Sequence, residues 1–219
     1  MNKKLEAANA NLSQKAYETL KHKIKYGELK QGELVSITAV AEELHISRTP
    51  VTIACQRLEY EKLLTIAPKQ GVIINSIAIA DARELYEMRA AIESYSAKLS
   101  FEYITEQDIA VLQESLERQK VDAARGDVYA FMEEDTTFHD YLLKRYKNSQ
   151  ISDAMEVLYD KFFMIGVECS SRPERLKSTI EEHEDIVRAL IEGNKNAFVD
   201  AVEHNIINGY RSLTNQYSR

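Results

Sequence analysis

The sequence predicts a mainly α-helical protein built from two parts, residues 1–75 and residues 76–219. Glycine and proline are scarce, with 7 and 3 residues, and apolar side chains recur at helical spacing through most of the chain. The two parts also differ in charge. The first holds 11 Lys and Arg against 8 Asp and Glu, a net charge of +3, whereas the second holds 17 against 27, a net charge of −10. This asymmetry indicates an anion-binding N-terminal module.

Several classes of protein are disfavoured by the same sequence. No stretch approaches the roughly 18 apolar residues of a membrane span, and the N-terminus lacks the apolar core of a signal peptide. Cys55 and Cys169 lie far apart in no metal-type spacing, which is typical of buried thiols in a reducing compartment. We therefore expect a cytoplasmic protein with no membrane partner.

The first part reads as three helices and a hairpin. Residues 12–26 place apolar side chains four apart, and a short helix is expected after Ser36. A longer helix follows a second capping serine, Ser47, with Pro50 in its first turn. Residues 64–75 read as two short strands around a turn. This order of elements predicts a winged helix-turn-helix.

In such a fold the start of the third helix points at DNA, where its free N–H groups suit a phosphate. Ser47, Arg48 and Thr49 lie there and can donate to phosphates or base edges. Lys69 and Gln70 fall at the tip of the hairpin, near the DNA backbone. For any one of these residues, an ordinary capped helix with a solvated face remains the alternative.

The same stretch resembles the DNA-binding domain of the GntR family. The residues that carry the resemblance are Ser47-Arg48-Thr49-Pro50-Val51, Arg57-Leu58-Glu59, Leu63 and Gly71. Thr52 and Ile53 stand where the family usually has Arg-Glu, and Lys62 replaces a usual glycine. The resemblance implies a double-stranded DNA operator, read in an altered or weaker way. The residues expected at the DNA interface are Ser36, Ser47, Arg48, Thr49, Thr52, Arg57, Lys69, Gln70 and Gly71.

The second part reads as helices throughout. Helical spacing, capping residues and terminal glycines divide it into six segments, listed here in order: 79–104, 105–126, 127–148, 149–171, 172–193 and 194–217. Because the links between them are short, we predict an all-α bundle of six helices.

Four polar residues fall on three of these helices. Asp135 and His139 are four apart and project from one face toward a common point. His183 and His204 each lie beside apolar residues on a later helix. A single buried histidine is usually a hydrogen-bonded core residue, but three of them with an aspartate favour a divalent metal site. Neutral imidazoles and a carboxylate suit zinc first, with nickel or manganese as alternatives.

The pattern also resembles the FCD effector domain, which is found in the FadR branch of GntR regulators. Its elements here are Arg89-x-x-x-Glu93, Asp135-x-x-x-His139 and two later histidines, His183 and His204. The resemblance implies a metal held by Asp135, His139, His183 and His204, with open positions for a small carboxylate effector.

Two further residues are expected to face that effector. The resemblance makes Arg89 a candidate clamp for its carboxylate, because a guanidinium matches a carboxylate bidentately. An i,i+4 ion pair with Glu93 is the equal alternative. Asn208, one turn after His204, is the second candidate.

We therefore expect a repressor of transcription that binds DNA as a homodimer and responds to a small organic acid, and not an enzyme. Two alternatives stay open. One is a metal-dependent hydrolase or lyase whose winged domain makes other contacts, although Glu182 and Glu184 point about 100° away from His183 on their helix. The other is a regulator that responds to acyl-CoA.

Overall fold

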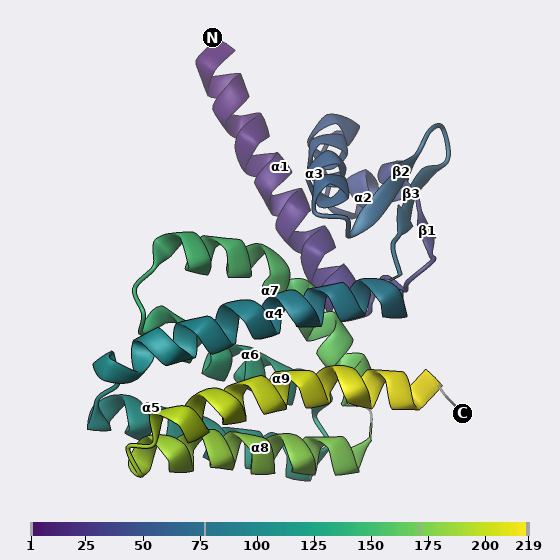
Figure 1. The fold of residues 1–219 in the computed structure, drawn as a ribbon. Coiled ribbons are helices and arrows are strands. Elements are labelled where there is room, and N and C mark those ends of the chain that lie inside the picture. The colour runs from purple at the N-terminus through teal and green to yellow at the C-terminus, as the bar shows by residue number, and fades with distance from the viewer. Residues whose placement is uncertain (1, 77, 171, 218–219) are drawn as a thin grey trace. The chain divides into compact units, whose positions relative to one another are not determined.

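The computed structural model describes residues 2–76, 78–170 and 172–217, which form two compact units, Met1–Ile77 and Ala78–Arg219. Helices dominate both units (Figure 1), and each unit is described by itself below. None of the described helices is long and apolar enough to cross a membrane.

The first unit is a winged helix-turn-helix. Its helices are α1 (Asn2–Lys25), α2 (Ile37–Glu43) and α3 (Arg48–Tyr60). Its strands are β1 (Leu34–Val35), β2 (Leu64–Ala67) and β3 (Gly71–Ile74). The strands form an antiparallel sheet in the order β1-β3-β2. Helix α1 begins before the expected Leu12, and the two-residue strand β1 is too short to leave a pattern in the sequence.

Apolar residues of α1 and α3 build the core of this unit. Ala16, Leu20 and Ile24 lie on the buried face of α1, and Val51 and Leu58 lie on the buried face of α3. The spacing of four between the α1 residues keeps them on one side of the helix, as the sequence predicts.

The hairpin, called the wing below, packs closely on the start of the helix-turn-helix. Gly71 opens β3 with a φ of +135°, and a Cβ there would collide with the carbonyl oxygen of Val35 in β1. Glycine is therefore required for β3 to pair with β1. Ser36, which follows β1 directly, accepts a 3.4 Å hydrogen bond from the backbone N–H of Ala39 and caps α2.

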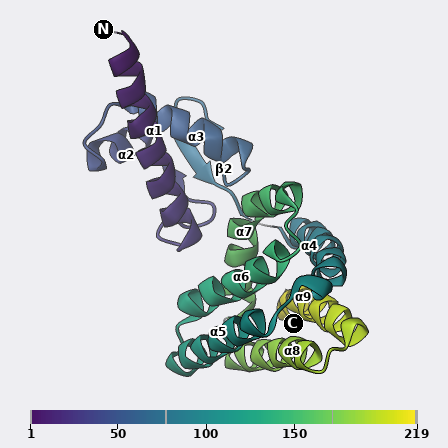
Figure 2. The ribbon, with the colours of Figure 1, turned by 90° about the vertical axis from the view of Figure 1, so that its left-hand side faces the viewer.

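The second unit is a bundle of six α-helices in the described part of the chain, joined by short links (Figure 2). These are α4 (Ile79–Ser100), α5 (Glu106–Arg125), α6 (Val128–Lys144), α7 (Ser149–Cys169), α8 (Pro173–Ile191) and α9 (Lys195–Tyr217). A short 3₁₀ turn, Phe101–Tyr103, follows α4. The mainly α-helical fold class with a winged N-terminal unit is thus confirmed.

Helix pairs and caps fix the arrangement of the bundle. Helix α9 packs on α4 and α8, and α5 packs on α6 and α8. Thr105 and Asp108 form a capping box at the start of α5, and Gly126 ends that helix with a φ of +67°. Apolar side chains such as Phe138 and Ile186 are fully buried between the helices. Buried polar residues from α4, α5, α6 and α8 lie among them and form the site described next.

Candidate metal centre and nucleic-acid interface

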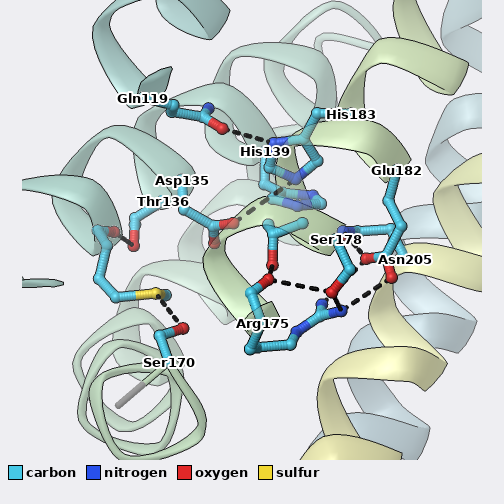
Figure 3. A network of polar contacts seen from close by, with 12 residues as sticks. Gln119, Asp135, Thr136, His139, Ser170, Arg175, Ser178, Glu182, His183 and Asn205 are labelled. Carbon is cyan, nitrogen blue, oxygen red and sulfur yellow. Dashed lines mark hydrogen bonds and ion pairs between the residues drawn. The ribbon is translucent and has the colours of Figure 1, made fainter. Parts of the chain in front are cut away.

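Three potential metal ligands meet inside the helical unit. Asp135 and His139 lie one turn apart on α6, and His183 approaches from α8 (Figure 3). All three are buried, and one ligand atom from each lies within 4.8 Å of the other two. The i,i+4 spacing on α6 therefore brings the aspartate and the first histidine to one point, as the sequence predicts.

His139 is oriented by a carboxylate from another helix. Its Nδ1 lies 2.7 Å from Oε2 of Glu93 on α4. An ionised carboxylate can only accept, so Nδ1 donates and the lone pair of the ring is at Nε2. Burial alone raises the pKa of Glu93, but Arg89 and His139 outweigh it and lower that pKa to about 2. Glu93 therefore remains an acceptor for His139.

His183 is oriented by a carboxamide and an aromatic ring. Its Nδ1 lies 2.8 Å from Oε1 of Gln119 on α5, so this nitrogen donates and the lone pair is again at Nε2. The ring stacks on Phe138 with centroids 4.4 Å apart and planes 9° apart. Burial, followed by the electrostatic influence of His139, Arg89 and Arg175, lowers the pKa of His183 well below its usual value. The imidazole is therefore neutral and able to bind a metal.

Both Nε2 atoms are buried and have no hydrogen-bond partner among the described residues. Nε2 of His183 lies 3.5 Å from Oδ1 of Asp135. A buried polar atom without a partner costs about 1–3 kcal/mol, so native proteins rarely keep two together. A divalent cation would satisfy both lone pairs and the carboxylate at once. The donor set of two imidazole nitrogens and one carboxylate oxygen suits zinc, nickel or manganese.

The expected fourth ligand, His204, does not join this group. Its side chain is exposed on α9, whereas its neighbour Asn205 is buried. The buried face of α9 includes Val202, Ile206 and Leu213. Residue 205 shares this face, and residue 204 is turned about 100° away from residue 205. The assignment of His204 as a ligand is therefore corrected by the phase of the helix.

A second polar network ties α8 to α9 beside the three ligands (Figure 3). Both terminal nitrogens of Arg175 donate to the carboxylate of Glu182, at 2.8 and 2.9 Å. Asn205 and Asn208 also donate to Glu182, from their Nδ2 atoms at 2.9 and 3.0 Å. Asn208, expected to contact an effector, is thus bound to Glu182 in this structure.

Arg89 forms the i,i+4 ion pair with Glu93, which is the alternative to an effector clamp. Its Nε donates to Oε1 of Glu93 at 2.7 Å, and this i,i+4 pair is almost fully buried. The guanidinium also lies 5.2 Å from the centroid of the Phe162 ring. In this structure Arg89 holds the carboxylate that orients His139.

The carboxylates weighed as bases of a hydrolase both have other partners. Glu182 is held by Arg175 and the two asparagines, and the exposed Glu184 lies 2.9 Å from Nζ of Lys120.

Gln119, Arg175, Glu182 and Asn205 were not assigned to the site from the sequence. Gln119 left no signal, because it contacts a histidine 64 residues away. Asn205 could have been found from the sequence, because it lies three residues after Val202 and one before Ile206, on the apolar face of α9.

The start of α3 presents the expected DNA-contacting residues. Ser47, Arg48 and Thr49 are exposed, and the side chain of Ser47 makes no capping hydrogen bond within the described part of the chain. Thr52 donates from its Oγ1 to the backbone oxygen of Arg48 at 3.0 Å. Ile53 is 46% exposed on the same helix. Because an exposed isoleucine on a reading helix suits a thymine methyl group, Ile53 joins the candidates for DNA contact.

Other residues expected at the DNA interface have different roles in the structure. Arg57 donates to Oε1 of Gln14 at 2.9 Å and lies 3.6 Å from the centroid of the Tyr17 ring, so it joins α3 to α1. Ser36 caps α2, and Gly71 allows the sheet to close, as described above. Lys69 and Gln70 are exposed at the tip of the wing. The exposed residues that have no such role within the unit are therefore Ser47, Arg48, Thr49, Lys69 and Gln70.

Comparison with known protein families matches both units. The FCD domain family matches residues 84–208, which contain the three ligands and both polar networks. The family described as bacterial regulatory proteins, gntR family, matches residues 12–74, which contain the helix-turn-helix and the wing.

Curated relatives and a solved structure resemble most of the chain. The transcriptional repressor RspR of Escherichia coli is 30% identical over 183 residues, covering 82% of this chain and 78% of the relative. The gluconate operon transcriptional repressor of Bacillus subtilis is 25% identical, covering 86% of this chain and 74% of the relative. The structure of E. coli McbR/YncC superposes with a TM-score of 0.80 at 25% identity, covering 94% of this chain and 98% of the other.

Proposed function

Since this chain belongs to the GntR family of bacterial transcription regulators and carries an FCD domain, we propose that it represses transcription in response to a small organic acid. The acid binds at a divalent metal in the helical unit and changes the affinity of the winged units for an operator. The observation that carries the proposal is the pair of buried Nε2 atoms of His139 and His183 beside Asp135, which have no hydrogen-bond partner in the described part of the chain.

The three ligands leave room in the coordination shell of a metal. Zinc takes at least four donors, so a centre with three protein ligands binds water or an effector oxygen in addition. A carboxylate is the natural effector group, because it is a hard anionic donor and brings a negative charge to the buried metal. The metal would supply Lewis acidity and a fixed charge to which that carboxylate binds.

The charges around the centre favour an anionic effector. Asp135, Glu93 and Glu182 contribute three negative charges, and Arg89 and Arg175 contribute two positive ones. With neutral histidines, a divalent cation leaves the group with a net charge of +1. A monoanion would neutralise this excess, which supports a monocarboxylate over a larger polyanion.

The DNA-binding half of the proposal rests on the exposed start of α3. Arg48 and Thr49 reach base edges or phosphates from the N-terminal turn, and Lys69 lies at the tip of the wing. Operators usually contain two half-sites, so we propose that the chain binds as a homodimer. An effector acts on such a dimer only if its affinity differs between the DNA-binding and the released arrangement.

Repression is the proposed direction because relatives of this chain are named repressors. In this scheme the protein blocks a promoter without effector and leaves it when the effector binds.

The proposal is tested with purified protein and DNA from upstream of its own gene. We expect a large preference over random DNA at physiological salt, and a loss of that preference when the right organic acid is added to the metal-loaded protein. His139→Ala and His183→Ala should bind the same DNA but lose the response to the acid together with the metal. Full metal occupancy in both variants would overturn the metal centre, and equal binding to random DNA would overturn the regulator.

A further inference from the structure

The exposed side of α3 narrows the set of bases that this helix can read. Its buried side, which includes Val51, Ala54 and Leu58, belongs to the core of the winged unit. On the opposite side, Ile53 is 46% exposed and follows the exposed Thr49 by one turn. Both lie in the first two turns of the helix, the part whose side chains reach base edges in a helix-turn-helix. Ile53 thus keeps much of its apolar surface available to the bound DNA.

One of the two arginines of α3 is engaged within its own unit. Arg57 donates to Gln14 at 2.9 Å, lies 3.5 Å from Oε1 of Glu61 and stacks on the Tyr17 ring. Arg48, in the first turn, is exposed. Arginine is the commonest reader of guanine, because guanine presents two acceptors, O6 and N7, in the major groove. Helix α3 can therefore offer one arginine to a guanine, and it stands at the start of the helix.

Thr52 does not supply a second donor for guanine. Its Oγ1 donates to the backbone oxygen of Arg48 at 3.0 Å, so the hydroxyl proton is used inside the helix. The hydroxyl can still accept through its remaining lone pair. An acceptor suits the N6 amine of adenine, whereas it repels the O6 and N7 acceptors of guanine.

Ile53, the next residue, carries no polar group in its side chain. Packed against guanine, it would cover O6 and N7 without giving them a partner, which weakens binding. Thymine instead presents its C5 methyl group in the major groove, where an apolar side chain can contact it. The two adjacent residues therefore match the two bases of one pair, with an acceptor for adenine and an apolar surface for thymine.

We propose that Ile53 reads the methyl group of a thymine, and that the operator carries an A·T pair where it faces residues 52 and 53. The partner of this surface is DNA, because residues 1–75 carry a net charge of +3 and the exposed Arg48 lies on the same helix. The inference rests on the proposed function and adds to it a base pair that the reading helix recognises.

The test removes the methyl group from the DNA. Binding sites are selected from random double-stranded DNA with the purified full-length protein, and each thymine of the selected site is then replaced by deoxyuridine, which lacks only the C5 methyl. We expect one thymine in each half-site whose replacement weakens binding about fourfold, which is the effect of one buried methyl group.

Variants of Ile53 connect that thymine to the protein. Ile53→Ala should bind the thymine and deoxyuridine sites equally, because the side chain that contacts the methyl group is gone. Ile53→Val should keep the preference for thymine, since it remains branched and apolar. The matched control is Ile191→Ala, which removes another exposed isoleucine, at the end of α8 in the helical unit. It should leave both the affinity and the preference unchanged.

A gain of specificity provides a test that misfolding cannot imitate. Thr52→Arg adds donors beside Ile53, so selection with this variant should recover guanine at the pair where the native protein selects A·T. Unchanged selection by the folded variant would overturn the inference. An equal loss on deoxyuridine replacement in the native protein and in Ile53→Ala would also overturn it, as would a selected site in which no thymine is sensitive. In these cases the proposed function would stand. If selection recovered no preferred sequence at all, the regulator itself would fall together with this inference.

Discussion

Nδ1 of His139 and Oε2 of Glu93 lie 2.7 Å apart, although the two residues are 46 positions apart in the chain. Helix α4 thus supplies the group that fixes the tautomer of a candidate ligand on α6. Arg89 completes the arrangement, because its ion pair with Glu93 keeps that carboxylate ionised. The Arg-x-x-x-Glu spacing on α4 therefore supports the candidate metal centre through His139.

Glu93→Gln should weaken metal binding by about 10- to 100-fold, because a neutral amide orients His139 less strongly and lowers the basicity of its ring. The measurement is the Kd for Zn²⁺ by chelator competition. The control is Glu102→Gln, which removes an exposed carboxylate that pairs with Lys195. An unchanged Kd in a folded Glu93→Gln protein would show that Glu93 only packs against the histidine.

Arg48→Ala should weaken binding to DNA and lower the slope of log affinity against log salt concentration by about 1, because one phosphate contact is lost. Arg57→Ala is the matched comparison. Its guanidinium lies between α3 and α1, so its loss should lower the free energy of unfolding by about 1 kcal/mol and leave the salt slope unchanged. A lower salt slope in Arg57→Ala, together with an unchanged slope in Arg48→Ala, would mean that Arg57 faces the DNA.

Asp108→Asn should destabilise the helical unit at neutral pH. Burial raises the pKa of Asp108, but hydrogen bonds from Tyr141 and Thr105 and the charge of Arg145 outweigh it and lower that pKa to about 2. The folded-state pKa lies below the unfolded one, so the stabilisation is complete above about pH 4 and is lost as the pH falls toward 2.

We therefore expect a loss of about 1–2 kcal/mol at pH 7, measured by urea unfolding, with the difference between the two proteins shrinking toward pH 2. A constant difference across this range would show that the charge of Asp108 does not contribute.

Lys62→Gly should stabilise the winged unit. Lys62 follows α3 with a φ of +59°, a left-handed conformation that a side chain makes costly and glycine adopts freely. The expected gain is up to about 1 kcal/mol in the free energy of unfolding, measured by urea unfolding. Lys30→Gly, at another exposed lysine, should not stabilise. A loss of stability in Lys62→Gly would mean that the side chain of Lys62 contributes more than its backbone costs.

Much of the fold could be predicted from periodicity and caps. The apolar spacing of four along α1, and Thr105 and Gly126 at the ends of α5, each marked a helix that the structure contains. Strand β1 was missed, because two residues are too few to alternate and because its pairing depends on Gly71, far along the chain.

The site was predictable only where its residues share a helix. Asp135 and His139 follow from i,i+4 geometry alone. Histidines are usual metal ligands, which favours His204 from the sequence, but the phase of α9 buries Asn205 instead. Gln119 could not be predicted, since its contact with His183 depends on how α5 packs on α8. Contacts between helices require the packing of the bundle, which no single segment contains.

The short strand β1 determines how stiff the DNA-binding unit is. Val35 pairs with Val72 in the wing, and the next residue, Ser36, caps the first helix of the helix-turn-helix. The wing and α2 are thereby joined through two adjacent residues, Val35 and Ser36, without a linker between them that could act as a hinge. The unit should approach DNA as a single rigid body, and little conformational entropy should be lost when the wing reaches the duplex. Affinity would then depend on shape matching at the first encounter, and a poorly spaced operator could not be accommodated by bending the protein.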